Sequence, residues 1–140
     1  MKRLIGFLPV ATLAVVLAAP LGAQTFRVAG SVPFEFMVGG QSMPSGDYTV
    51  ARVGGTDQIK VSDGNASALS WASNASPSPQ ERTGQALLIF HRYGDQYFLS
   101  RIVDGSRDAG MELPISRTEK ELSKTASLEK FETVAVLARR

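Results

Sequence analysis

The feature that most restricts the fold of this chain is the alternation of apolar and polar side chains with a period of two residues. Val32, Phe34, Phe36 and Val38 fall on one face of an extended segment, which is the spacing of a half-buried β-strand. Pro33 has no N–H to donate to a ladder, so this strand is expected to lie at a sheet edge or to begin there. The alternation predicts a protein built mainly from strands.

Other segments repeat this pattern between turn signals such as Gly54-Gly55 and Asp63-Gly64. The expected strands cover residues 32–38, 47–53, 58–62, 66–72, 85–93, 96–103 and 131–138. In contrast, residues 73–84 carry no apolar period and are expected to form a mobile surface loop.

The strongest hairpin joins 85–93 to 96–103 through Gly94-Asp95, because Gly at the first position of a two-residue loop favours a type II′ turn. In that register Tyr93 pairs with Gln96, His91 with Phe98 and Ile89 with Ser100. The opposite face is expected to carry Leu88, Phe90, Tyr97, Leu99 and Val103. Since both faces are apolar, the hairpin should lie at the centre of the sheet; a loop one residue longer would shift every pair.

One helix is expected, beginning after Ser116. Ser116 and Glu119 have the spacing of a capping box, in which the serine hydroxyl binds the amide of Glu119 and the glutamate side chain reaches back. The weak apolar stripe of this segment indicates a surface helix with solvated charges, Glu119 among them. The sequence predicts an all-β domain with this one short helix, folded as an antiparallel β-sandwich or small β-barrel of about seven or eight strands.

Residues 1–23 have the layout of a secretory signal peptide. Lys2 and Arg3 precede an apolar run, which ends in small residues before Gln24. An uncleaved membrane helix is the alternative, but Pro9 and Pro20 interrupt the run. We expect cleavage within a residue or two of Ala23, a single β-rich domain over 24–140, and export to the periplasm or medium without stable membrane insertion.

The composition limits what such an exported domain can do. The chain has no cysteine, so it must fold without disulfides. The leader holds two of the 15 basic residues, leaving 13 against 13 acidic ones. A nearly neutral mature chain has no charge basis for binding nucleic acid.

Few residues suggest catalysis. His91 is the only histidine, so a His-rich metal site is excluded, as is a zinc site that needs cysteine. His91 could serve as a base for Ser100 on the partner strand, but the sequence offers no evident acid to orient the ring. Glu35 and Asp47 are a formal acid–base pair with no known separation. The sequence therefore predicts no catalytic residue, metal or cofactor.

Aromatic and arginine side chains supply a candidate binding surface instead. On a sheet face such residues can form a platform for a sugar or a partner protein. The same residues would equally serve as the core and rim of an ordinary sheet. The candidates are Trp71, His91, Arg92, Tyr93 and Tyr97.

Four blocks of the chain resemble a known group of proteins. They begin at Val32 (Val-Pro-Phe-x-Phe-x-Val-Gly-Gly), Met43 (Met-Pro-Ser-Gly-Asp-Tyr-Thr-Val), Phe90 (Phe-His-Arg-Tyr-Gly-Asp-Gln-Tyr-Phe-Leu-Ser) and Glu112 (Glu-Leu-Pro-Ile-Ser-Arg-Thr-Glu). In this order, after such a leader, they are similar to small exported proteins of unknown function from acidobacteria and related soil bacteria. The resemblance implies export and one compact domain, and it supplies no site residues.

The expected function is that of a non-enzymatic binding or structural protein of the cell envelope, with an envelope protein or a glycan as partner. Two alternatives stay open. One is a glycan or small-molecule binding module that uses the Tyr/Trp face, and the other is an enzyme centred on His91.

Overall fold

The computed structural model describes residues 26–106, 109–125 and 132–140. The expected leader, residues 1–23, lies outside the described residues. Strands make up most of the described chain, together with one α-helix, α1 (Arg117–Thr125), and one 3-10 turn, η1 (Pro79–Glu81). The strands are β1 (Arg27–Val32), β2 (Phe36–Val38), β3 (Gln41–Met43), β4 (Gly46–Arg52), β5 (Gln58–Ser62), β6 (Ser67–Trp71), β7 (Ser73–Asn74), β8 (Ala86–Tyr93), β9 (Gln96–Val103), β10 (Gly110–Glu112) and β11 (Glu132–Arg139).

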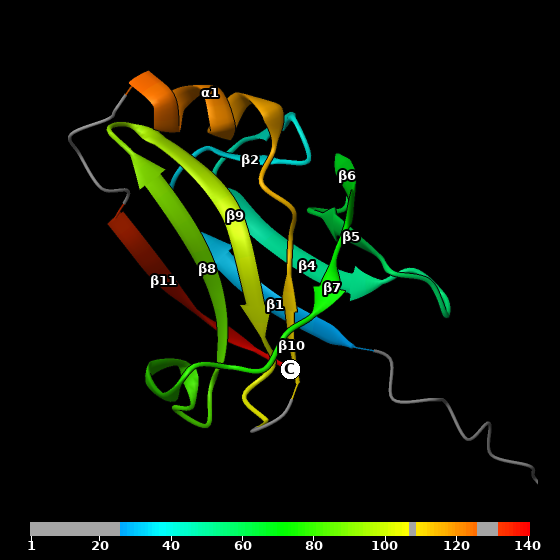
Figure 1. The fold of residues 1–140 in the computed structure, drawn as a ribbon. Helices are drawn as coiled ribbons and strands as arrows, with labels where there is room; N and C mark the ends of the chain where they lie inside the picture. Colours follow the sequence, from blue (N-terminus) through cyan, green and yellow to red (C-terminus); the bar gives the residue numbers. More distant parts are fainter. Residues whose placement is uncertain (1–25, 107–108, 126–131) are drawn as a thin grey trace, which may run out of the picture.

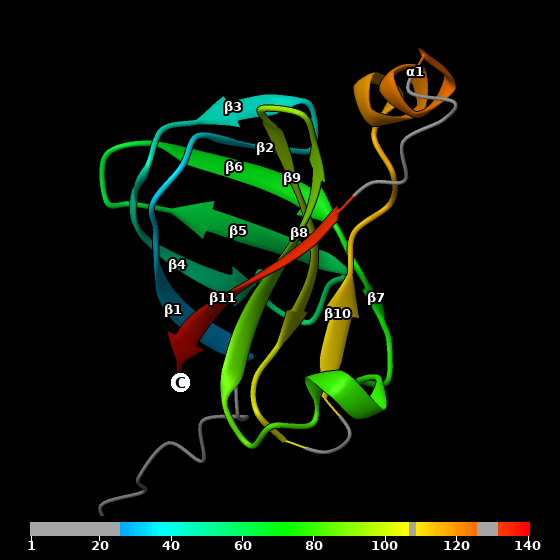
Figure 2. The same ribbon diagram turned by 90° about the vertical axis from the view of Figure 1, so that its left-hand side faces the viewer.

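These strands form one strongly curved sheet in the order β3-β2-β9-β8-β11-β1-β4-β5-β6, with β10 and β7 extending from β9 (Figure 1). In Figure 2, β4, β5 and β6 run across the direction of β8 and β9, so the sheet folds over on itself. Its two ends meet where β2 contacts β6 and the Gln41 side-chain amide donates to the Ser67 carbonyl at 3.2 Å. The result is a nearly closed barrel, which confirms the expected all-β class with one short helix.

Alternate residues of the strands fill the interior. Tyr48, Phe36 and Phe90 are the largest fully buried aromatic side chains, and Phe36 meets the other two rings edge to face at 5.0 and 5.3 Å. Edge-to-face contacts suit the charge distribution of aromatic rings. The core is therefore continuous from β2 through β4 to β8.

The expected single strand over 32–38 is wrong, because the structure divides it into β1 and β2. Pro33 lies at the break. β1 pairs antiparallel with β4, whereas β2 pairs parallel with β9, with Met37 opposite Phe98. The inward residues are as expected, since Val32, Phe36 and Val38 are all buried. The chain thus crosses from one side of the barrel to the other within three residues.

The β8–β9 hairpin matches its expected turn, its central place in the sheet and its first pairs. Gly94 has a φ of +60°, the sign that the first central position of a type II′ turn requires. Tyr93 faces Gln96 and His91 faces Phe98, as expected. The expected Ile89–Ser100 pair is wrong. A β-bulge places Phe90 opposite Leu99 and Ile89 opposite Arg101, so Ser100 has no partner residue on β8.

The bulge also moves Val103 to the other face of the hairpin. Val103 packs with Leu87 and Ile89 in a second small apolar cluster, instead of joining Leu88 and Phe90 in the main core. A bulge shifts the alternation of every residue that follows it.

Residues 73–84 contain β7 and η1 and are held against the hairpin. Arg101 donates to the Ser76 carbonyl and to the Glu81 carboxylate, each at 3.0 Å. β7 pairs with β10, with Asn74 opposite Met111. Within the described part of the chain, no helix has the length and apolar character needed to cross a membrane.

Candidate functional site

The five residues that the sequence singles out lie in three places. Arg92 and Tyr97 are cross-strand partners on one face of the β8–β9 hairpin. His91 and Tyr93 both contact Glu119 of α1 on the other face. Trp71 ends β6, beyond the hairpin, at the edge of the sheet. The structure therefore does not form one platform from them.

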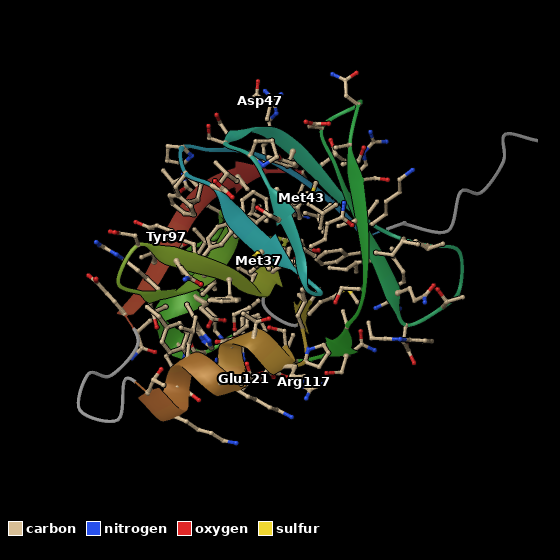
Figure 3. The ribbon with its side chains drawn as sticks, turned by 90° about the horizontal axis from the view of Figure 1, so that it is seen from above. Met37, Met43, Asp47, Tyr97, Arg117 and Glu121 are labelled. Carbon is tan, nitrogen blue, oxygen red and sulfur yellow. The ribbon has the colours of Figure 1, made fainter. Side chains whose placement is uncertain are left out.

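Arg92 and Tyr97 have ordinary packing contacts. The Tyr97 ring stacks on Phe34 with centroids 3.7 Å apart, and the Arg92 guanidinium lies 5.6 Å from the centre of the Tyr97 ring. Arg92 also donates to the Gly94 carbonyl at 2.7 Å. Figure 3 shows Tyr97 on the side of the hairpin that faces β2, with α1 on the opposite side. These two residues belong to the rim of the sheet.

The opposite face holds a chain of four polar side chains, which we call the His91 cluster: Ser100, His91, Glu119 and Tyr93. Ser100 Oγ lies 3.1 Å from His91 Nε2, and His91 Nδ1 lies 2.7 Å from Glu119 Oε1. The Tyr93 hydroxyl donates to the same Oε1 at 3.0 Å. Glu119 is only 4% exposed and Ser100 only 7%.

Local structure explains how these groups meet. His91 and Tyr93 are two residues apart on β8 and so point to the same face. Ser100 lies at the bulge of β9, and bulges commonly re-aim a side chain. Glu119 comes from the first turn of α1, whose start is set by Ser116: the Ser116 hydroxyl accepts the Glu119 amide at 3.2 Å.

Two expectations about Glu119 are wrong. Its backbone amide is capped as expected, but its carboxylate binds His91 and Tyr93 and does not complete the capping box. Nor is it a solvated charge, because it is buried against β8. It supplies the acid for His91 that the sequence did not reveal. Arg117 and Glu121, labelled on α1 in Figure 3, are the exposed charges of this helix, with side chains 93% and 67% exposed.

Tyr93 is the residue whose acidity this cluster changes most clearly. Burial, followed by its hydrogen bond to the Glu119 carboxylate and the charge of that carboxylate, raises the pKa of Tyr93 to about 12. All three causes favour the neutral phenol over the phenolate. Tyr93 therefore stays a hydrogen-bond donor well above neutral pH.

Trp71 lines a groove of about 540 Å³ between the β6–β7 corner and the segment that leads into α1. The indole is 63% exposed, and Ile115 across the groove is 52% exposed. The remaining lining residues are Asp57, Ala72, Ser73, Asn74, Glu112, Leu113 and Pro114. This volume lies in the range of small-molecule sites.

The polar groups of the groove are partly fixed in place. Arg52 donates to Asn74 Oδ1 at 2.6 Å, which turns the amide nitrogen of Asn74 into the end available as a donor. Arg101 lies 3.9 Å from Glu112, whose side chain is still half exposed. An aromatic surface thus adjoins two carboxylates and one oriented amide.

The groove and the His91 cluster adjoin each other through one strand segment. The Leu113 amide donates to the Ser100 carbonyl at 2.8 Å, and Leu113 also lines the groove. On the neighbouring residues, Arg101 and Glu112 form the ion pair described above. The backbone of 112–115 therefore separates the two places.

A larger hollow of about 1040 Å³ lies over the outer face of β11, β1, β4 and β5 and includes none of the predicted site residues. Its floor carries small side chains such as Ala29 and Thr49, while Lys60 and Asp63 on its border have opposite charge. Its aromatic lining residue, Tyr48, is only 2% exposed, so the hollow presents little aromatic surface to a ligand. We therefore place the candidate site at the groove and the His91 cluster.

Sequence reasoning missed Glu119, Asp57, Asn74 and Glu112. The capping position of Glu119 was visible, but its burial depends on His91, 28 residues away. The three groove residues come from separate turns and strands with no common motif. Among the described residues, no three histidine or acidic side chains gather as a metal site.

Comparison with known proteins adds no relative: no family model, no curated protein and no solved structure matches this chain.

Proposed function

We propose that this chain is an exported binding domain of the cell envelope, and that its ligand is a saccharide held in the Trp71 groove. The observation that carries the proposal is the side chain of Trp71, which is 63% exposed in a groove that Asp57, Asn74 and Glu112 also line. Trp71 and Ile115 both expose apolar surface in this groove, and exposed apolar surface rimmed by polar residues is typical of ligand-binding grooves. The resemblance of the chain to small exported proteins and its leader-like N-terminus support the location.

The chemistry of the groove favours a sugar. The apolar face of a pyranose ring can stack on an indole, while its hydroxyls both donate and accept hydrogen bonds. Asp57 and Glu112 are acceptors at the groove, and the Asn74 amide nitrogen is a donor. Two carboxylates disfavour an acidic ligand, so the expected ligand is a neutral or amino sugar.

Trp71 itself is the probe for this proposal, because it is the only tryptophan of the chain. A ligand that covers the indole should change its fluorescence intensity and shift its emission to shorter wavelength. Titration with chitotetraose, a neutral amino-sugar oligomer, should produce a saturable change. Polygalacturonate, which is acidic, should produce a smaller one at equal concentration.

Matched variants separate the groove from general surface binding. Trp71→Ala should abolish heat of binding in calorimetry, while Leu69→Ala should leave it unchanged. Leu69 is 57% exposed on the same strand but does not line the groove. Equal losses in both variants, or saturable binding that survives Trp71→Ala, would exclude the groove as the site. If neither chitotetraose nor neutral plant and envelope oligosaccharides change the fluorescence, the saccharide proposal fails.

A further inference from the structure

We propose that Ser100, His91 and Glu119 form a nucleophilic site that hydrolyses small acyl esters. This activity goes beyond the proposed binding function and does not depend on it. It rests on the His91 cluster, whose side chains have the order of contacts that a serine nucleophile requires: hydroxyl, imidazole, carboxylate.

The hydrogen bonds assign the proton positions on the ring. An ionised carboxylate only accepts, and the Tyr93 hydroxyl already donates to Glu119 Oε1. In the neutral imidazole, Nδ1 therefore carries the proton and donates it to Oε1 at 2.7 Å. Nε2 is then the acceptor that faces Ser100 Oγ at 3.1 Å. This tautomer is the one in which histidine acts as a general base toward serine.

The cluster also has the shielding that makes such contacts effective. Glu119 is 4% exposed, so its charge acts on the ring with little competition from water. The His91 side chain keeps 17% of its surface exposed, which leaves an approach to the ring from solvent. With Ser100 itself 7% exposed, the approach suits a small acyl group such as acetyl.

The β-bulge is the second structural support for this assignment. A regular β9 would pair Ser100 with Ile89, whereas the bulge leaves Ser100 without a partner residue on β8. Its side chain instead meets His91. Bulges are over-represented beside active sites, where they re-aim a side chain.

The proposed reaction has two balanced steps. Ser100 Oγ attacks the ester carbonyl carbon while its proton passes to His91 Nε2, and the carbon–oxygen bond to the alcohol breaks as His91 returns that proton to the leaving oxygen. Water then attacks the acyl-serine, giving its proton to Nε2, and Ser100 regains a proton as the carboxylic acid departs. The Glu119 carboxylate accepts the Nδ1 hydrogen bond and stabilises the imidazolium in both steps.

A fluorophosphonate probe tests the nucleophile directly on the unmodified chain. Trypsin should release Tyr93–Arg101, in which Ser100 is the only serine, so a mass increase on this peptide identifies the site. We expect labelling of Ser100 and its complete loss in Ser100→Ala. Ser70→Ala is the control, because Ser70 is an equally buried serine whose hydroxyl donates to the Trp71 carbonyl instead.

Turnover of p-nitrophenyl acetate provides the second measurement. His91→Asn should lower the rate about 100-fold or more, and Ser70→Ala should leave it unchanged. Absence of probe on the Tyr93–Arg101 peptide of the wild-type chain would overturn the proposal, and this result needs no variant to fold. Hydrolysis that persists in Ser100→Ala would overturn it as well. Neither result would affect saccharide binding at Trp71, so the two proposals fail separately.

Discussion

Glu119 is a carboxylate buried against the barrel, where two side chains of β8 donate hydrogen bonds to it. His91 and Tyr93 both reach its Oε1, at 2.7 and 3.0 Å. Hydrogen bonds to a buried charged group contribute more to stability than neutral ones do. The attachment of α1 to the barrel therefore depends on Glu119, although charged residues also occupy the exposed positions of this helix.

Replacing the Glu119 carboxylate tests how much it contributes to the free energy of unfolding. We expect Glu119→Gln to lower the free energy of unfolding by about 2 kcal/mol, because the neutral amide oxygen is a weaker acceptor than the carboxylate for the two hydrogen bonds from His91 and Tyr93. Glu121→Gln is the control: its side chain is 67% exposed and pairs with Arg117 on the same helix, so the change should cost less than about 0.5 kcal/mol. Urea unfolding followed by circular dichroism measures both. Equal effects would show that Glu119 does not anchor the helix.

Tyr93 predicts how stability depends on alkaline pH. Its pKa is about 12 in the folded chain and about 10 in an unfolded one. The contribution of the Tyr93 hydroxyl to the free energy of unfolding is therefore fully present below pH 10 and is lost as the pH rises through 12. The reason is that the unfolded chain releases the phenol proton at a lower pH than the folded chain does. Between pH 9 and pH 11, wild type should lose more stability than Tyr93→Phe, as measured by urea unfolding at each pH. A parallel decline of the two would contradict the assignment.

Helix α1 shows, at the scale of an element, what local sequence determines. It has nine residues, shorter than an isolated helix that is stable in water, so it needs its cap and its contacts with β8. We expect Ser116→Ala to reduce the free energy of unfolding by about 1 kcal/mol, because the Glu119 amide loses its acceptor. Ser123→Ala should change it little, since Ser123 is exposed within the helix and binds only the Lys120 carbonyl. Thermal melts of the two variants give the comparison.

The same element and the neighbouring hairpin show where sequence reasoning succeeded and where it failed. The cap at Ser116 and the turn at Gly94 were predictable, because each is encoded by residues within a few positions of one another. The bulge at Ser100 carries no marker such as glycine, so the pairing was extended one residue too far and Val103 was placed on the wrong face. The burial of Glu119 depends on contacts with a strand far away in the chain.

At the scale of the whole molecule, the described residues from 26 onward form a barrel with a core of its own. Its core is continuous, and its first described strand, β1, is held by β4 and β11. The candidate groove and the His91 cluster both lie within this unit. The described strands and core residues all come after residues 1–23, the segment expected to direct export.

This separation predicts a processed product. When the full chain is expressed in a Gram-negative host, the periplasmic fraction should contain a protein whose intact mass corresponds to a start at Gln24, or within two residues of it. The same fraction should show the β-rich circular dichroism spectrum of the folded barrel. Recovery of the full-length mass from the membrane fraction would instead favour the uncleaved anchor.

The place of β11 between β8 and β1 has a consequence for the timing of assembly. Strand β11, Glu132–Arg139, lies between two strands that are made much earlier, and among the described strands it joins them into one ladder. Before β11 has been made, β8 and β1 therefore have no common hydrogen-bonded neighbour. Contacts between distant parts of a chain form slowly. Closure of the barrel is therefore expected to be a late step in folding.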